Sequence, residues 1–183
     1  MDIATYNLID SQVVYEDNHI IVLNKRASQI VQSDKTGDVC LVEIMKDYLK
    51  EKYNKPGRVY CGLVHRLDRP VSGLVIFAKT DKALSRLTKQ IKNREIKKIY
   101  WAIVKGMPQQ HEATLRNYLR RNEKQNKSYI VPEGTINAKL AILDYKLIGH
   151  GTRGYSLLEL VLHTGRHHQL RGQLTGIGYH LRR

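Results

Sequence analysis

The sequence predicts an α+β fold built on a mixed, largely antiparallel β-sheet with flanking helices. Short apolar runs of strand length outnumber the segments with helical periodicity, and short turns join most of these runs. A series of strands linked in this way is typical of an α+β protein. The chain has 183 residues, 42% of them hydrophobic, which is enough for one domain with a buried core.

The first 64 residues are predicted to hold three strands and one helix. Residues 13–15 and 20–23 are strands around the turn at Asp17-Asn18. Residues 40–52 form an amphipathic helix, because apolar side chains recur there at helical spacing: Leu41, Ile44, Met45, Tyr48 and Leu49. Lys55-Pro56-Gly57 ends this helix, and residues 59–64 are the third strand.

The elements of the remaining chain follow from the same patterns. Residues 74–78 form an apolar strand, and a helix capped by Thr80 or Asp81 follows it with a core stripe of Leu84, Leu87 and Ile91. Residues 100–104 are a strand, and the polar residues 113–131 are a loop or hairpin. Residues 139–148 and 155–162 form a strand pair, and a last helix begins near Gly165 with Leu170, Leu174 and Ile177 in its apolar face.

The most informative segment lies between two of these strands. Residues 65–73 read His-Arg-Leu-Asp-Arg-Pro-Val-Ser-Gly, so Asp68 stands between Arg66 and Arg69. Close arginines favour the ionised form of a carboxylate, and their guanidinium groups match phosphate. An ionised and positioned carboxylate can act as a nucleophile. The segment therefore indicates a reactive aspartate beside a phosphate-binding surface; the alternative is an aspartate that only caps a turn.

The charge distribution indicates an anionic partner. The formal net charge is +14, and residues 1–50 carry −3 of it, so residues 51–183 carry +17. A basic field of this size is typical of proteins that bind nucleic acid or an anionic surface. The helix after residue 80 bears basic side chains outside its core stripe, which predicts either an RNA-facing surface or a solvated face: Lys82, Arg86, Lys89, Lys92 and Arg94.

Cysteine usage and hydropathy favour a cytoplasmic protein. Cys40 and Cys61 are too far apart for a Cys-x-x-Cys site and are expected to be reduced thiols. No apolar run approaches the roughly 20 residues that a membrane span needs. The first residues lack the basic-then-apolar order of a signal peptide.

Three motifs in sequence order resemble those of the RluA-type RNA pseudouridine synthases. Residues 65–73 resemble the family's signature around its aspartate, with Val71 where threonine is usual. Residues 97–104 resemble its Lys-x-Tyr-x-Ala strand, and residues 162–171 resemble its Thr-Gly-Arg-x-His-Gln-Ile-Arg segment. The opening at residues 15–25 also fits, without the proline and glycine expected after Lys25.

This resemblance implies the activity and the residues that carry it. The family isomerises specific uridines to pseudouridine in structured RNA, either ribosomal or transfer RNA, without a cofactor or metal. It implies that Asp68 is the catalytic carboxylate, that Tyr100 contacts the extruded base, and that Arg171 pairs with the aspartate. Arg66, Arg69 and Arg166 are the expected RNA contacts, with Arg166 at the start of the last helix.

A metal site at the histidines is not expected. His163 and His167 are four residues apart, but position 163 precedes the expected helix start, and no cysteine or acid lies nearby in sequence. His65 is expected to pack the Asp68 loop. His167 stands where the family usually has threonine or serine.

The chain is expected to be a single pseudouridine synthase catalytic domain, residues 1–183, that lacks the family's closing strands after the last helix. A fragment, a truncated product and a short form that closes its own sheet are all compatible with this pattern. An open sheet edge would favour self-association, and no protein partner is predicted. The alternative function is a non-catalytic RNA-binding remnant of the same fold. A basic ribosome- or DNA-associated module would not explain the aspartate among arginines.

Overall fold

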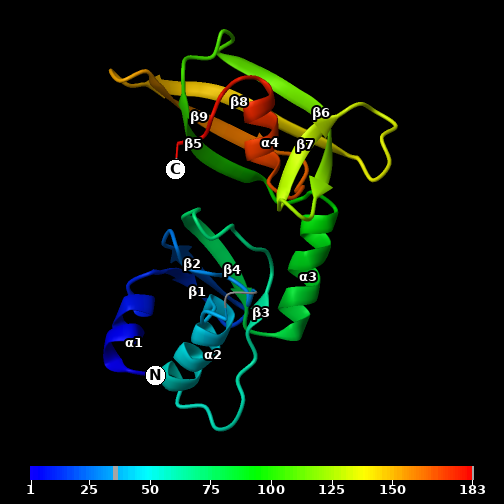
Figure 1. Cartoon of the computed structure of the whole chain (residues 1–183). Helices are drawn as coiled ribbons and strands as arrows, with labels where there is room; N and C mark the ends of the chain where they lie inside the picture. Colours follow the sequence, from blue (N-terminus) through cyan, green and yellow to red (C-terminus); the bar gives the residue numbers. More distant parts are fainter. Residues whose placement is uncertain (35–36, 183) are drawn as a thin grey trace. The chain divides into compact units, whose positions relative to one another are not determined.

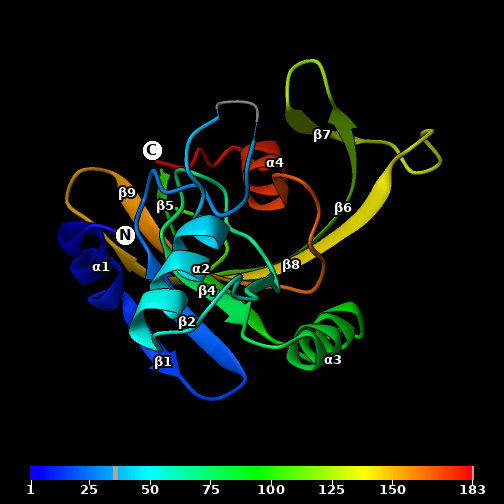
Figure 2. The ribbon, with the colours of Figure 1, turned by 90° about the horizontal axis from the view of Figure 1, so that it is seen from below.

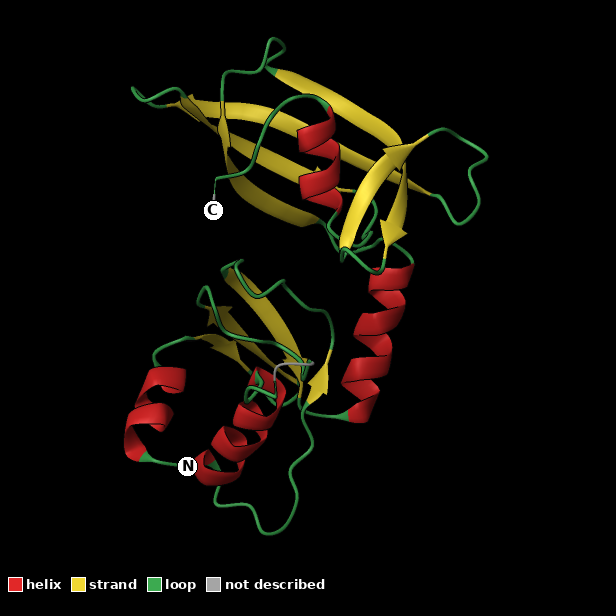
Figure 3. Ribbon diagram, in the orientation of Figure 1, coloured by secondary structure: helices red, strands yellow, loops and turns green. Residues whose placement is uncertain are grey.

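The computed structural model describes residues 1–34 and 37–182, and the chain forms two compact units, Met1–Asn93 and Arg94–Arg183. Each unit has its own sheet (Figures 1 and 3). The predicted α+β class with largely antiparallel strands is confirmed, and every strand pair in the described ranges is antiparallel. The prediction of one catalytic domain over residues 1–183 stays a prediction.

The first unit contains a four-stranded sheet in the order β1-β2-β4-β3. The β1–β2 hairpin and β4 occur where the sequence predicted them. The turn between β1 and β2 forms because the Asp17 carboxylate accepts hydrogen bonds from the N–H groups of His19 and Ile20, both at 2.7 Å. The strands are β1 Val13–Glu16, β2 Ile20–Lys25, β3 Gly62–Leu63 and β4 Gly73–Ala78.

The predicted strand at residues 59–64 was wrong in extent. Only Gly62 and Leu63 pair with β4, opposite Ala78 and Phe77. The apolar residues before them pack into the core from an irregular segment: Cys61 is buried, and Val59 is partly buried against the same cluster. Their hydrophobic pattern therefore reflects burial of a loop and not a ladder of hydrogen bonds.

The described residues of the first unit form three helices, α1 Ile3–Asp10, α2 Leu41–Lys52 and α3 Asp81–Lys92. Helix α2 confirms the predicted amphipathic helix and lies over the sheet (Figure 2). Its buried side chains pack against those of β2 and β4 in one apolar core: Leu41, Met45, Tyr48 and Leu49 against Ile21, Leu23, Val75 and Phe77. Thr80 is the N-cap of α3 and accepts a bond from the Ala83 N–H.

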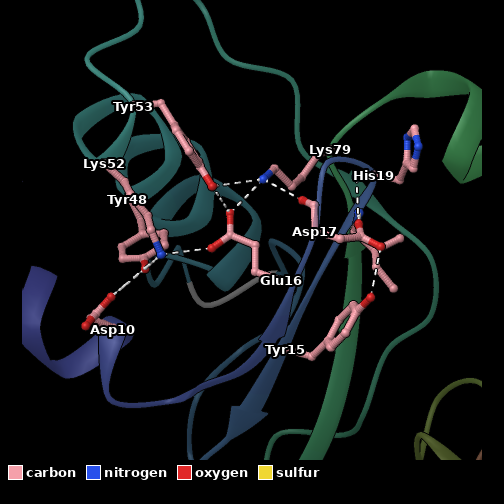
Figure 4. A network of polar contacts seen from close by, with 10 residues as sticks. Asp10, Tyr15, Glu16, Asp17, His19, Tyr48, Lys52, Tyr53 and Lys79 are labelled. Atoms are coloured by element: carbon pink, nitrogen blue, oxygen red, sulfur yellow. Dashed lines mark hydrogen bonds and ion pairs between the residues drawn. The ribbon is translucent and has the colours of Figure 1, made fainter.

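A polar network joins β1, α2 and the end of β4 at the rim of this core (Figure 4). The Glu16 carboxylate accepts bonds from Lys52 at 2.8 Å, Lys79 at 2.7 Å and the Tyr53 hydroxyl at 2.6 Å. Burial alone would raise the pKa of Glu16, but these three donors outweigh it and lower the pKa to about 2.

The second unit contains a five-stranded sheet in the order β5-β9-β8-β6-β7. Residues 113–131, predicted as a polar loop or hairpin, form a hairpin. Strand β6 pairs with β8 over residues 112–119 and with β7 over residues 118–122. The strands are β5 Lys98–Lys105, β6 Glu112–Asn122, β7 Lys127–Val131, β8 Lys139–His150 and β9 Tyr155–Leu162.

Helix α4, Gln169–Gly176, covers one face of this sheet (Figure 1). Leu174 is fully buried against Val104, Leu143, Leu158 and Leu160. The helix begins four residues later than predicted. His168 precedes it in the left-handed conformation (φ 48°), and the side chain of Gln169 accepts a bond from the Arg166 N–H at 2.9 Å, which closes a turn where helix was expected.

Both cysteines are free thiols, as the sequence predicted. Cys40 and Cys61 are buried and unpaired. Burial raises the pKa of the Cys61 thiol to about 12, which makes it unreactive. In the part of the chain that the structure describes, no helix combines the length and apolar character needed to cross a membrane.

Candidate active site

Asp68 lies on the loop between β3 and β4, as predicted. Asp68 and its neighbours Arg66 and Arg69 are exposed. The carbonyl of Asp68 accepts a bond from the Val71 N–H at 3.0 Å, which forms a tight turn over Pro70. Gly73 then starts β4 at φ +131°, a conformation that residues with a side chain rarely adopt. The backbone at this position therefore favours the glycine of the Ser-Gly motif.

His65 fixes the start of this loop. Its Nε2 accepts a bond from the backbone N–H of Ile76 on β4 at 3.3 Å. The histidine therefore packs the loop against the strand, as the sequence predicted. The loop is thus held at its entry by a side chain and at its exit by the glycine turn.

Arg69 is already engaged within the first unit. Its guanidinium contacts the Asp38 carboxylate at 2.9 Å, and both side chains are about half exposed. A pair exposed to this degree contributes little to stability, about 0–1 kcal/mol. A pocket of about 190 Å³ lies beside this pair and is lined by Ser28, Gln29, Ile30, Asp38, Val39, Leu41, Ile44 and Arg69.

A buried lysine lies underneath the Asp68 loop. Lys25 is 0% exposed, and its ammonium donates to the carbonyls of Arg26 at 3.0 Å, Arg69 at 3.2 Å and Val71. Burial lowers the pKa of Lys25, and the negative charge of Asp68 acts in the opposite direction. The sequence analysis gave Lys25 no role, although a lysine that ends an apolar strand was a visible signal.

An amide pair supports the turn that follows Lys25. Gln12, which is buried, and Gln29 bond to each other in both directions, at 2.9 and 3.0 Å. The Gln29 side chain also accepts the N–H of Arg26 at 2.7 Å. Ser28 then donates its N–H to the carbonyl of Arg69 at 2.8 Å. The turn at residues 26–29 is therefore bonded on one side to Gln12 and on the other to the Asp68 loop.

The other predicted catalytic residues belong to the second unit. Tyr100 lies on β5, opposite Leu160 of β9, and is half-buried against the core under α4. Arg171 lies on α4 and is exposed. The structure thus brings Asp68, Arg66 and Arg69 together on one loop of the first unit, and places Tyr100, Arg166 and Arg171 in the second.

Two buried glutamines, which the sequence analysis did not single out, anchor α4 and so direct Arg171 outward. Gln173 is 0% exposed, and its amide nitrogen, whose two protons are shared among three acceptors, lies 3.1 Å from the carbonyl oxygen of Leu115, 3.2 Å from that of Ala141 and 2.9 Å from the side-chain oxygen of Asn117. Gln169 donates to Gln173 at 2.9 Å and accepts the Thr164 hydroxyl at 2.8 Å. One face of the helix is therefore bonded to β6 and β8, and Arg171 is exposed on another face.

Arg166 does not lie at the start of the helix, which corrects the sequence prediction. It precedes α4 by three residues, and its Nε donates to the carbonyl of Leu140 on β8 at 2.8 Å. The guanidinium is therefore held against the end of a strand and not at a helix N-terminus. Nε is the donor in this bond.

The histidines of the last motif have separate surroundings. His163 bonds through Nε2 to Asp144 at 2.6 Å, and this bond is the main reason that the pKa of Asp144 is lowered. His167 stacks on His168 with 3.8 Å between ring centroids and lies 3.1 Å from the Ser128 hydroxyl of β7. His167 therefore packs the start of α4 against the hairpin.

A family model described as RNA pseudouridylate synthase matches residues 19–175. The chain belongs to this family. The match includes all three motifs and extends over both compact units. It confirms the RluA-type resemblance, and the similar proteins agree with it.

Curated relatives carry the same family name. The chain is 34% identical over 176 residues to an uncharacterized RNA pseudouridine synthase of Chlorobaculum parvum, covering 91% of this chain and 52% of that protein. It is 34% identical over 175 residues to ribosomal large subunit pseudouridine synthase D of Zymomonas mobilis, covering 94% and 54%. The chain thus spans about half the length of the curated relatives it matches.

Two solved structures share the fold. Human RNA pseudouridylate synthase domain containing 4 matches with a TM-score of 0.82 and 22% identity, over 97% of this chain and 69% of that one. Human RNA pseudouridylate synthase domain containing 1 matches with a TM-score of 0.74 and 24% identity, over 93% and 66%.

Proposed function

We propose that this chain carries catalytic residues of an RNA pseudouridine synthase and isomerises uridines in structured RNA, with Asp68 as the catalytic carboxylate. The observation that carries the proposal is the exposed Asp68 between two arginines, on a loop held from below by a buried lysine, in a chain of this family. Exposure leaves the carboxylate accessible to a ribose, and a braced loop keeps it in one position.

The reaction needs few groups. It breaks the bond between ribose C1′ and uracil N1, turns the base, and joins C1′ to C5, which loses its proton. Asp68 acts at the ribose as nucleophile or base. Tyr100 offers a ring on which the extruded base can stack, and Arg171 a positive charge for the carboxylate of Asp68. Neither role requires an oxidant or a reductant.

RNA contacts are assigned to three arginines. Arg66, exposed two residues before Asp68, fills the space that the extruded uridine leaves or holds the RNA backbone. Arg69 and Arg166 bind phosphates, Arg69 by exchanging Asp38 and Arg166 through its terminal nitrogens. The names of several relatives make large-subunit ribosomal RNA the first substrate to try, with transfer RNA second. We place this activity in the cytoplasm, because two unpaired cysteines fit a reducing compartment.

The decisive test uses RNA labelled with tritium at uridine C5, because isomerisation releases that tritium. We expect Asp68→Asn to abolish release while RNA binding stays within about twofold, since the change removes the charge and keeps the shape. Asp47→Asn, at an exposed position on α2, is the control for the loss of one carboxylate charge elsewhere on the surface. If the Asp68→Asn variant turned over within tenfold of the parent, Asp68 would lose the catalytic role.

A non-catalytic RNA-binding protein of the same fold is the other outcome of this test. RNA binding by the parent chain without tritium release from either class of RNA would support it. Binding and release together would support the proposed activity.

A further inference from the structure

We propose that one face of α3 is a docking surface for the phosphates of paired RNA, separate from the Asp68 loop. The surface consists of Lys82, Arg86 and Lys89, and we call it the α3 basic stripe. All three residues are exposed. The inference rests on the proposed function, which brings RNA to this chain, and it adds a surface that holds a stem beside the target uridine.

The stripe lies on the side of α3 that faces away from the core. On the other side of the helix, Leu84, Leu87 and Ile91 pack in one apolar cluster with residues of the sheet. The stripe residues stand at positions i, i+4 and i+7, which at 3.6 residues per turn fall within an arc of about 60°, nearly opposite these leucines and the isoleucine. The three cations therefore form a single row, about 10 Å long from the first to the last.

The charges of the stripe are not balanced within the protein. In the part of the chain that the structure describes, none of the ion pairs includes a stripe residue. The one acid of the helix, Asp81, lies about 100° around the helix from Lys82 and accepts a bond from the Tyr60 hydroxyl at 3.4 Å. Like charges three and four positions apart destabilise a helix. The row of cations therefore lowers the stability of α3 unless an anion meets it.

Helix α2 of the same unit shows how charge is distributed on a solvated helix face. Both helices have 12 residues. Helix α2 carries three basic and three acidic residues, and Lys46 pairs with Glu43 at 2.8 Å. Helix α3 carries four basic residues, the stripe and Lys92, and one acidic residue. A solvated face accounts for the mixed charges of α2, whereas the segregated positive charge of α3 indicates an anionic partner.

The composition of α3 favours paired RNA over other polyanions. Proteins that bind single strands stack the bases on aromatic side chains, and α3 has no aromatic residue. A helix that lies on a membrane exposes an apolar face, whereas the apolar residues of α3 pack against the sheet. An RNA stem presents its phosphates outward and its bases inward. A row of lysine and arginine side chains can bind such a backbone without reading the sequence.

The stripe is close enough to the Asp68 loop to contact the same RNA molecule. Helix α3 lies beside β4, the strand that follows this loop (Figure 1). Val64, directly before the loop, belongs to the apolar cluster that holds Leu87 of α3. The stripe lies across the helix from this cluster, and a helix with its side chains is about 10–12 Å wide. A stem next to a uridine bound at Asp68 can therefore reach the stripe.

The test measures binding of two triple variants at several salt concentrations. One probe is an RNA duplex of about 16 base pairs, and the other is a single-stranded oligouridine of the same length. The stripe variant combines Lys82→Gln, Arg86→Gln and Lys89→Gln. The control variant removes the same charge from exposed positions elsewhere in the first unit and combines Lys50→Gln, Lys55→Gln and Arg58→Gln. Glutamine is a good helix former, so α3 should still fold, and thermal melts check this.

We expect the stripe variant to lower the salt slope of duplex binding by roughly 2, because three phosphate contacts are lost. The control variant should change this slope by less than half as much, and the stripe variant should affect oligouridine binding no more than the control does. Equal slopes for the two variants on the duplex would overturn the inference, since only net charge would then matter. A stripe variant that lost oligouridine binding as strongly as duplex binding would overturn the assignment to paired RNA.

A second readout separates docking from the reaction. With RNA labelled at uridine C5, we expect the stripe variant to release tritium at the parent rate when RNA is saturating, and to need a severalfold higher RNA concentration for half of that rate. A parent protein without tritium release would count against the proposed function, and the duplex titration would still decide the inference. A stripe variant that bound the duplex like the parent but lost binding to vesicles containing phosphatidylserine would overturn it in favour of a membrane surface.

Discussion

Ser28 is held in a backbone conformation that serine disfavours. Its φ is +74°, in the left-handed region, and its N–H donates to the carbonyl of Arg69 on the Asp68 loop at 2.8 Å. A non-glycine residue in this region costs on the order of 1–3 kcal/mol. The family resemblance leads one to expect a glycine in this segment, after Lys25. The strain is thus kept at the junction of two loops beside the proposed catalytic residue.

Replacing Ser28 by Gly should therefore stabilise the protein. We expect the free energy of unfolding to rise by about 0.5–1 kcal/mol, because glycine removes the strain but adds conformational freedom to the unfolded chain. In a chain of this size, each kcal/mol raises the melting temperature by roughly 2–4 °C. Ala27→Gly, at the exposed neighbour whose φ is not positive, should lower the melting temperature. Equal effects of the two changes would mean that Ser28 is not strained.

Glu16 makes the stability of the first unit sensitive to acid. Its pKa in the folded protein, about 2, lies below the ordinary value of 4.5. A carboxylate of this kind contributes fully above the ordinary pKa, and the contribution disappears as the pH falls through the folded value. Chemical unfolding should therefore give Glu16→Gln a lower free energy of unfolding than the parent at pH 7. This difference should shrink as the pH falls from the ordinary pKa of 4.5 to the folded value of about 2.

Glu43→Gln is the control for this acid dependence. Glu43 is 56% exposed and pairs with Lys46, one turn away on α2. Pairs of this kind contribute a few tenths of a kcal/mol. If the deficit of Glu16→Gln were constant with pH, the charge of Glu16 would not be its cause.

At the scale of elements, Gln173 determines how α4 sits on its sheet. It is fully buried, and its amide serves three acceptors on β6 and β8. Gln173→Met keeps the volume and leaves these acceptors without their donor, which should cost about 1–3 kcal/mol. Thermal melts should show a loss of several degrees, whereas Gln110→Met, at an exposed position, should have little effect. If Gln173→Met melted like the parent, the amide would not be what holds the helix.

The sequence predicted most elements because hydrophobic periodicity decides them. Strands β2, β8 and β9 bury alternate side chains, and α2 buries one stripe. Helix α1 was missed because only Ile9 of its residues is buried, which leaves no apolar pattern to detect. The start of α4 was misplaced because a side chain, Gln169, closes the preceding turn. Such bonds leave no trace in hydropathy.

The candidate site was less accessible to physical reasoning from the sequence. Asp68 stood out by its arginine neighbours, but Tyr100 and Arg171 were identified only through the family's motifs. Lys25, Gln12 and Gln29 were given no role, since their roles arise from hydrogen bonds between segments distant in sequence. Whether a polar side chain at a strand end is buried depends on the hydrogen-bond partners that another loop supplies.

At the scale of the whole chain, positive charge is unevenly divided between the two units. Residues 94–183 contain 16 Lys/Arg and 6 Asp/Glu, a net +10, whereas residues 1–93 carry +4. In the second unit four basic residues gather on the β6–β7 hairpin: Arg120, Arg121, Lys124 and Lys127. A concentrated basic surface attracts RNA through its phosphates. We therefore predict that this hairpin contacts RNA.

The last prediction concerns the salt dependence of RNA binding. Each phosphate contact adds about 0.7–0.9 to the slope of log affinity against log salt concentration. The slope measured for the parent protein should therefore correspond to several phosphate contacts. Lys124→Ala combined with Lys127→Ala removes two exposed charges of the hairpin and should reduce the slope by roughly 1.5 if both contact phosphate. Lys50→Ala combined with Lys55→Ala removes the same charge from exposed positions of the first unit. Equal reductions in filter-binding titrations would assign the effect to net charge alone, and a parent slope near zero would remove RNA as the partner.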